Sequence, residues 1–290
     1  MKNTTYFCYR EAHSEKELEE LLRLRYQVYR NSRLAGFCPE NAWGIDLDAW
    51  DARSLHFGLF RCDGSTEEPV GYMRVIQEGE THQAGYIRSI AWRKSAEMLE
   101  TVANPPEVPF PAMSYFPGAM EKFGPMLAEA SLEGKKYGEA SRLVLREDCS
   151  GLKLTLSLIE YAIAINFIEN GFHRSVLTCS QLHSRIYNHY GWQQVEGTKT
   201  EEIVRGEDRV PRNLMVMRWE DFLQNAPVEI RHRVKRMALA YRETGRIHYY
   251  PDQPNYYYPP AYFTHHRPTS QRFMSAMYSV IDRKSLALVS

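Results

Sequence analysis

Apolar and polar positions alternate with two different periods along the chain, and these periods predict both helices and strands. Ser14 and Glu17 have the spacing of a capping box, and apolar side chains then recur every three or four positions as far as Tyr29. This pattern predicts an amphipathic helix that begins near Ser14. Two short apolar runs, residues 56–62 and 70–76, flank an Asp-Gly-Ser turn signal, so they predict a β-hairpin.

The next part of the chain has a weaker pattern. Gly36 and Pro39 interrupt the polar and aromatic stretch 31–51, which predicts a loop. Residues 77–137 are dominated by a Pro-rich run at 104–117, which predicts a second loop, and by a helical pattern at 120–132.

From residue 139 the pattern becomes strong again. Alternation over residues 139–146 predicts a strand. The apolar segment 152–169 is too long for a strand and is followed by Asn170 and Gly171, so it predicts a buried helix. The remaining predicted elements are a strand at 175–179, a helix at 183–190, and strands at 192–196 and 213–219. This order of elements predicts an α/β fold with a mixed, mostly antiparallel central sheet flanked by helices.

The last 70 residues differ from the rest. Residues 222–244 predict a basic amphipathic helix, and residues 249–266, rich in Tyr and Pro, predict an irregular path over the surface. We therefore expect one domain over residues 1–220 and a C-terminal helical and Tyr/Pro-rich extension over residues 221–290.

Composition narrows the class of protein. Of the 290 residues, 43% are apolar and 25% are charged, which is typical of a soluble globular protein. The N-terminus lacks an apolar signal core, and the five cysteines show no CxxC spacing, so we expect a cytoplasmic protein without a metal site or a disulfide framework. The net charge is zero, but residues 221–290 carry ten Lys and Arg against five Asp and Glu. A basic tail on an acidic body favours an acidic partner or an anionic surface.

Charged residues lie where burial is expected. Arg25 falls on the apolar face of the first helix, three aspartates stand at positions 46, 48 and 51, and the strand at 139–146 holds two arginines. Unpaired buried charge is costly, so these groups need partners. A structural salt-bridge network, a solvated acidic loop and a substrate-binding site are all left open at this stage.

Taken together, these segments resemble the autoinducer (acyl-homoserine-lactone) synthases and the related long-chain N-acyl amino acid synthases, which have a GNAT-like fold. The family pattern R-x-x-V-F is matched from Arg25 to Tyr29, with Tyr in place of Phe, and its D-x-x-D is matched by Asp48 and Asp51. A Gly-x-x-Arg segment ends at Arg74. The family pattern E-x-S-R-x-x-x-R is matched at every fixed position by Glu139, Ser141, Arg142 and Arg146.

A further segment resembles the wider GNAT superfamily. Tyr187 lies four residues before Gly191, as does the tyrosine that protonates the departing thiolate in many members; a packing role is the alternative. The loop expected to grip the donor phosphate, residues 146–151, has one glycine and two acidic residues. A helix N-terminus still favours a phosphate there. The degenerate loop favours an acyl carrier protein over CoA as donor.

The resemblance implies a set of site residues. Glu139 would accept the proton of the amine, and backbone N–H groups around Ser141 would hold the oxyanion if the strand bulges there. The expected catalytic residues are Glu139, Ser141 and Tyr187. The expected substrate-binding residues are Arg25, Tyr29, Phe37, Trp43, Asp48, Asp51, Arg74, Arg142 and Arg146. The expected donor-binding residues are Val144, Ser150 and Gly151.

The expected function is N-acyl transfer of a fatty acyl group, of long chain, from an acyl carrier protein or CoA thioester to the amine of an amino acid or a similar small molecule. No permanently bound cofactor is expected; acyl carrier protein, with its phosphopantetheine arm, or acyl-CoA acts as co-substrate. The basic segment 231–236 fits carrier-protein docking, and a peripheral membrane contact is left open; nucleic acid is not expected. An acyl-homoserine-lactone synthase, a CoA-dependent N-acetyltransferase and a non-catalytic acyl-ligand sensor remain as alternatives.

Overall fold

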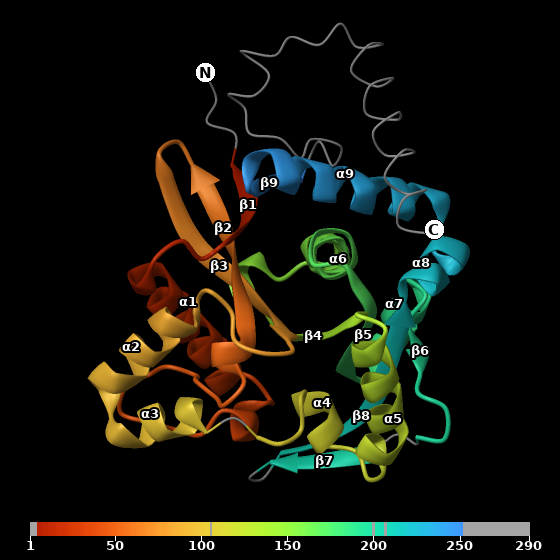
Figure 1. Cartoon of the computed structure of the whole chain (residues 1–290). Coiled ribbons are helices and arrows are strands. Elements are labelled where there is room, and N and C mark those ends of the chain that lie inside the picture. The colour runs from red at the N-terminus through yellow and green to blue at the C-terminus, as the bar shows by residue number, and fades with distance from the viewer. Residues whose placement is uncertain (1–4, 105, 199–200, 206–207, 252–290) are drawn as a thin grey trace, which may run out of the picture.

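A single twisted sheet organises the chain (Figure 1). The computed structural model describes residues 5–104, 106–198, 201–205 and 208–251. Within these residues the strands form a nine-stranded sheet in the order β6-β8-β5-β4-β3-β2-β1-β9, and β7 pairs with β8 beside this path. All pairings are antiparallel except that of β4 with β5, which is parallel. The predicted α/β fold with a mostly antiparallel mixed sheet is confirmed.

The strands vary widely in length. They are β1 (Tyr6–Glu11), β2 (Ser54–Asp63), β3 (Thr66–Gln77), β4 (Lys136–Leu145), β5 (Phe172–Ser180), β6 (Gln193–Gln194), β7 (Glu201–Arg205), β8 (Asp208–Arg218) and β9 (Arg246–Tyr249).

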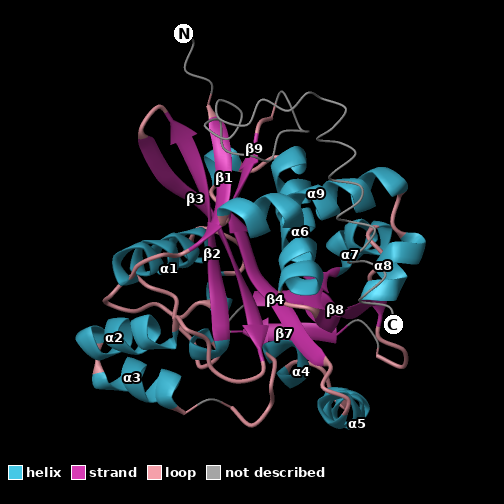
Figure 2. Ribbon diagram, turned by 45° about the horizontal axis from the view of Figure 1, so that its top comes forward, coloured by secondary structure: helices cyan, strands magenta, loops and turns pink. Residues whose placement is uncertain are grey.

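Helices cover both faces of the sheet (Figure 2). They are α1 (Glu15–Arg30), α2 (Ala84–Lys94), α3 (Ala96–Ala103), α4 (Pro111–Ser114), α5 (Ala119–Leu132), α6 (Leu152–Ile163), α7 (Gln181–His189), α8 (Trp219–Asn225) and α9 (Val228–Thr244). The first of these begins as predicted, because the Ser14 hydroxyl accepts a hydrogen bond from the Glu17 N–H.

Side chains that alternate along each strand divide the sheet into two faces. On one face, which we call the α6 face, Phe57, Leu59 and Met73 pack against α6 and α9. On the other, the α1 face, Phe60 and Tyr72 pack against α1 and α2. A third cluster lies on this same face of the sheet. In it, Ile76 and Leu214 pack with residues of α4 and α5. Because successive residues of a strand point to opposite faces, the position along a strand assigns each side chain to a face, except across a bulge.

Several elements were not predicted from the sequence. The strands β1, β7 and β9 and the helices α2 and α3 were missed, and α4 lies inside the run expected to be a loop. The predicted buried helix at 152–169 is confirmed, but its second half, Ala164–Glu169, is a π-helix. The hairpin, the helix at α5, the strand at β4 and the helix at α7 lie where the pattern predicted them.

The segment expected to be a separate extension is in part built into the domain. Strand β9 pairs with β1 from Phe7↔Tyr249 to Arg10↔Arg246. Met237 of α9 and Ile247 are fully buried in the same cluster as α6. Figure 1 shows α9 lying across α6. Most of the Tyr/Pro-rich run falls outside the described residues.

Candidate active site

A cavity of about 250 Å³ lies where β4 and β5 separate. The two strands pair from Lys136↔Phe172 to Glu139↔Val176, and within the described residues their pairing ends there. The following residues of both strands, 140–143 and 177–180, line the cavity. Tyr29 of α1 and Thr155 of α6 line it as well. Since α1 and α6 cover opposite faces, the cavity passes through the gap between the strands and opens toward both faces of the sheet.

Glu139 is a buried acidic residue that lines this cavity. It is 2% exposed, and its Oε2 accepts a hydrogen bond of 2.8 Å from the Ala112 N–H. Burial raises the pKa of Glu139 to about 8, because a carboxylate loses its hydration there. A carboxyl group with this pKa is well suited to exchange a proton with an amine near neutral pH.

The backbone of β4 bulges immediately after Glu139. Tyr72 pairs with Val144 and Arg74 with Ser141, so the single residue Met73 faces two residues of β4. Arg142, one of these two, has a φ of 57°. A bulge turns backbone N–H groups out of the ladder. The bulge expected at this position is therefore present, and it borders the cavity.

A buried network of ion pairs holds β3 and the loop after α1 together. Arg25 donates from Nη1 and Nη2 to the two carboxylate oxygens of Asp51, both at 2.9 Å. Arg74 donates from Nη1 to Asp51 Oδ1 at 2.7 Å and to Asp48 Oδ1 at 2.6 Å. Burial opposes the ionised form of Asp51, but the two guanidinium groups outweigh it and hold the pKa of Asp51 well below its ordinary value.

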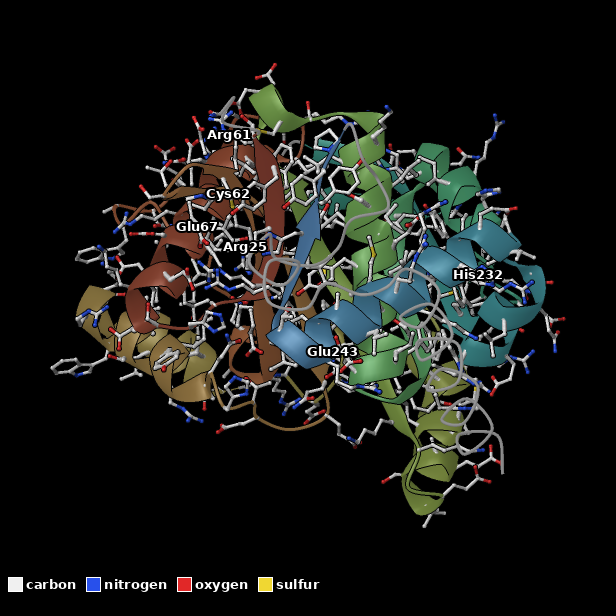
Figure 3. The ribbon with its side chains drawn as sticks, turned by 90° about the horizontal axis from the view of Figure 1, so that it is seen from above. Arg25, Arg61, Cys62, Glu67, His232 and Glu243 are labelled. Atoms are coloured by element: carbon white, nitrogen blue, oxygen red, sulfur yellow. The ribbon has the colours of Figure 1, made fainter. Side chains whose placement is uncertain are left out.

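This network changes the roles expected for its members. Arg25 and Asp51 are fully buried, and neither lines the cavity. Figure 3 shows Arg25 in the interior of the molecule. Asp48 is bound by Arg74 and by Arg142, whose Nη2 lies 3.1 Å from Asp48 Oδ2, so its charge is already neutralised. Of the open alternatives, the structural salt-bridge network applies to these residues.

The network extends to a neutral histidine. Burial lowers the pKa of His56 to about 4. Its Nε2 lies 2.9 Å from the backbone oxygen of Asp51, which can only accept, so Nε2 carries the proton. Its Nδ1 then accepts from the Tyr72 hydroxyl at 2.8 Å, and that hydroxyl accepts from Arg25 at 2.9 Å.

Arg74 connects the part of β4 that lines the cavity to this network. Its Nε donates to Ser141 Oγ at 3.0 Å, and both residues line the cavity. Arg142 also lines the cavity, and its guanidinium lies over the Tyr29 ring at 5.0 Å. The buried pairs thus orient two members of the predicted E-x-S-R pattern.

Tyr187 of α7 also lines the cavity. It also lines a small apolar pocket that opens from the same gap and that includes Met73, Ile163 and Trp192. Burial raises the pKa of Tyr187, so its hydroxyl keeps its proton at neutral pH. The cavity therefore has an apolar side toward the α6 face and a charged side toward the α1 face.

Five of the predicted site residues lie elsewhere. Trp43 is 40% exposed at the surface, where Arg23 donates to its backbone oxygen. Arg146 is bound by Asp148 and Glu68 at the end of β4. Val144 is buried in the cluster beside α1 and α2 and does not line the cavity. Ser150 and Gly151 are exposed at the start of α6 and do not line the cavity.

The structure adds cavity residues that the sequence patterns did not suggest. Arg33, Tyr115, His183 and Arg212 line it together with the predicted Phe37. Arg212 lies over the Phe37 ring at 5.7 Å. The one sequence signal for Arg212 is that it falls at the same alternate positions as the apolar Val210, Leu214 and Val216.

The basic helix α9 is largely bound to the domain. Arg233 donates to both oxygens of the buried Glu160, and Arg242 pairs with Glu169. Figure 3 shows α9 with His232 and Glu243 at opposite ends. Within the described residues, no group of three or more His, Cys, Asp and Glu side chains is arranged to hold a metal ion. Among the helices in the described ranges, none is long and apolar enough to cross a membrane.

Comparisons with known proteins give one family match and several similar solved structures. Residues 24–103 match the model of the acetyltransferase (GNAT) domain. No curated protein matches the chain. One similar solved structure is FeeM, an N-acyl amino acid synthase from uncultured soil microbes: it is 14% identical, with a TM-score of 0.47 over 78% of this chain and 97% of that one.

Two further solved structures show the same degree of similarity. BjaI, a CoA-dependent acyl-homoserine lactone synthase, is 13% identical, with a TM-score of 0.42 over 75% of this chain and 81% of that one. An acyl-CoA N-acyltransferase from Pseudomonas aeruginosa is 15% identical, with a TM-score of 0.41 over 74% of this chain and 99% of that one. The family match shows that residues 24–103 are similar to the acetyltransferase (GNAT) domain.

Proposed function

We propose that this protein is an N-acyltransferase that moves an acyl group from a thioester to the amine of an amino acid or a similar small molecule. The observation that carries the proposal is the position of Glu139, a buried acid with a pKa of about 8, beside a strand bulge in a cavity that opens toward both faces of the sheet. The thioester reaches the gap from the α6 face and the amine from the α1 face.

The chemical step needs a base, an oxyanion site and an acid. The amine nitrogen attacks the thioester carbonyl carbon, and its proton passes to Glu139 directly or through a water molecule. Backbone N–H groups of the bulge at Arg142 and Leu143 stabilise the oxyanion. When the carbon–sulfur bond breaks, Tyr187 protonates the thiolate. The products are an amide and a thiol, and Tyr187 recovers its proton from solvent.

Arg74 and Ser141 act as positioning residues in this scheme. The bond from Arg74 Nε to Ser141 Oγ fixes the strand at the bulge, and Arg74 is itself fixed by Asp48 and Asp51. A site held by rigid elements keeps its donors oriented without reorganisation during the reaction.

The acyl chain lies along the apolar side of the cavity, toward Met73, Ile163 and Trp192. The main cavity, about 250 Å³, is close to the lower end of the roughly 300–1,000 Å³ of small-molecule pockets. A long fatty chain therefore requires the apolar pocket to widen, whereas a short chain fits without change.

We infer that the donor thioester is carried by an acyl carrier protein, with acyl-CoA as the alternative donor. The loop before α6 offers Glu147 and Asp148 where a free CoA would place several phosphates, although Arg146 and Arg61 pair with Asp148. One phosphate on a phosphopantetheine arm meets less repulsion there than the phosphates of CoA.

The proposal is tested by incubating the protein with acyl carrier protein and CoA thioesters of two to sixteen carbons, each with an amino-acid pool and with S-adenosylmethionine. Mass spectrometry of the products is expected to show N-acyl amino acids. N-acyl-homoserine lactones would instead assign the lactone synthase activity, and acetylated amines alone would assign an N-acetyltransferase. Absence of any acylated amine with all donors would contradict the proposal.

A further inference from the structure

The charged side of the cavity carries cations in excess. Arg74 and Arg142 are neutralised by Asp46 and Asp48. Arg33, His183 and Arg212 also line the cavity, and among the described residues no ion pair joins any of these three to an acidic side chain.

Arg212 is the most buried of the three. It lies half-buried on β8, opposite Ser180 of β5 and with its guanidinium over the Phe37 ring at 5.7 Å. Burial lowers the pKa of Arg212, and the nearby Arg33 lowers it further. Removing a guanidinium from water without a carboxylate is costly. An arginine kept under these conditions is best explained by an anion that enters the cavity.

The strand register places Arg212 on the same face of the sheet as Glu139. Val176 of β5 pairs with Glu139 of β4 on one side and with Val216 of β8 on the other, and Ser180 of β5 pairs with Arg212 of β8. Residues at even intervals along β5 and β8 share a face, so Glu139, Ser180 and Arg212 all face α1. This is the face from which the amine approaches in the proposed function.

We propose that Arg212, assisted by Arg33, binds the carboxylate of the acceptor, so that the acceptor is an amino acid rather than a simple amine. This inference rests on the proposed function and deepens it. Arg25, Arg74 and Arg142 are already paired with internal aspartates, so the carboxylate site is assigned to a residue on β8. The planar guanidinium matches the two carboxylate oxygens.

A phosphate of the donor is the competing anion. The first turn of α6 has N–H groups that lack helical partners and would suit a phosphate, and Thr155 of that helix lines the cavity toward the α6 face. Arg212 lies on the α1 face, so the acceptor carboxylate is the anion that the geometry favours.

The test is calorimetric binding of two product analogues, N-octanoylglycine and N-octanoylglycinamide. Glycine adds no side chain, so the choice of acceptor does not restrict entry. We expect the unaltered protein to bind the acid at least tenfold more tightly than the amide, because charge-assisted hydrogen bonds contribute at this level. Arg212→Gln removes the preference and leaves the affinity for the amide unchanged, whereas Arg212→Lys retains part of it.

Arg209→Gln is the matched control, since Arg209 is exposed on the same strand and does not line the cavity. It should keep the full preference. Arg33→Gln should reduce the preference less than Arg212→Gln does, because Arg33 is exposed. The thermal midpoint of each variant shows that the fold is intact.

Three results would overturn the inference. Equal binding of acid and amide by the unaltered protein would show that the cavity has no carboxylate site. That result would not contradict N-acyl transfer to an amine. An unchanged preference in Arg212→Gln would assign the carboxylate to another residue. Weaker binding of 4′-phosphopantetheine by Arg212→Gln, with the acid unaffected, would assign Arg212 to the donor phosphate.

Discussion

Asp51 does not line the cavity, but it holds in place residues that lie next to the candidate site. It is fully buried and accepts hydrogen bonds from Arg25, from Arg74 and from the Asp48 N–H. Removing one partner of a buried ion pair leaves the other charge without compensation. The three charges therefore act as one structural unit beneath the reactive strand.

We expect Asp51→Asn to reduce the free energy of unfolding by about 3–5 kcal/mol, because two buried guanidinium groups lose their shared carboxylate. Urea denaturation followed by circular dichroism measures the change. The control is Asp63→Asn at an exposed position, which should remain within about 0.5 kcal/mol of the unaltered protein. A loss no larger than that of the control would contradict the structural role of Asp51.

The raised pKa of Glu139 predicts that the stability of the folded protein depends on pH. Its pKa is about 8 in the folded protein against an ordinary value of 4.5. The unfolded chain therefore releases this proton first, and the stability contributed by protonated Glu139 is lost as the pH rises from about 5 to about 8.

Glu139→Gln cannot ionise, so its thermal midpoint should rise relative to that of the unaltered protein as the pH increases through this range. Scanning calorimetry at several pH values measures the difference. Glu121→Gln, at an exposed position on α5, serves as the control and should show no such trend. A constant difference for Glu139→Gln from pH 5 to pH 8 would mean that the carboxyl group ionises normally.

At the scale of the element, strand β4 has two neighbours, and its hydrogen-bonded pairing with one of them, β5, stops partway along the strand. It pairs with β3 along its length but leaves β5 after Glu139, and the bulge at Arg142 and Leu143 lies in the part that has left. Arg142 adopts a left-handed conformation, with a φ of 57°, that side chains other than glycine rarely adopt. The bulge is therefore held by its surroundings, including the contacts of Arg142 with Asp46 and Asp48.

A pair of substitutions separates backbone conformation from side-chain contacts. Arg142→Gly and Arg142→Val both remove the guanidinium, but valine strongly resists a positive φ. Arg142→Val should be less stable than Arg142→Gly by about 1–2 kcal/mol in urea denaturation. Equal stability of the two variants would show that the backbone has left the bulged conformation.

The sequence patterns predicted the elements around the gap better than the partners of the charged residues. Alternation located β4, and the apolar run located α6, because both signals are local. Arg25 was expected to bind substrate, and its pairing with Asp51 was not predicted, because that pairing depends on how the loop after α1 folds back onto the helix. Arg212 was missed because its environment is formed by α1, α7 and the residues that follow α1, none of which is near it in sequence.

At the scale of the whole molecule, the C-terminal part of the described chain completes the sheet. Strand β9 covers the edge of β1, and α9 packs on α6, whose N-terminal turn borders the cavity. A basic composition had suggested a separate docking extension. The pairing of Arg233 with Glu160 shows that charge on a helix can serve its own domain instead.

Two truncations test this integration. Ending the chain after Gly245 removes β9 and exposes the edge of β1, so we expect a lower thermal midpoint and increased aggregation. Ending it after Pro251 retains β9 and serves as the control. Light scattering during a thermal ramp measures both effects. Equal behaviour of the two truncated proteins would show that β9 does not stabilise the sheet.

The most direct test of the central claim is the dependence of acyl transfer on pH, measured with a thioester donor and an amino acid that the product screen has identified. We predict that kcat/KM rises to a plateau with an apparent pKa of about 8, the value of Glu139. We also predict that Glu139→Gln, with its fold intact, loses at least about 100-fold in kcat/KM and does not show this step. Turnover by Glu139→Gln at the rate of the unaltered protein, with the same pH profile, would contradict the account.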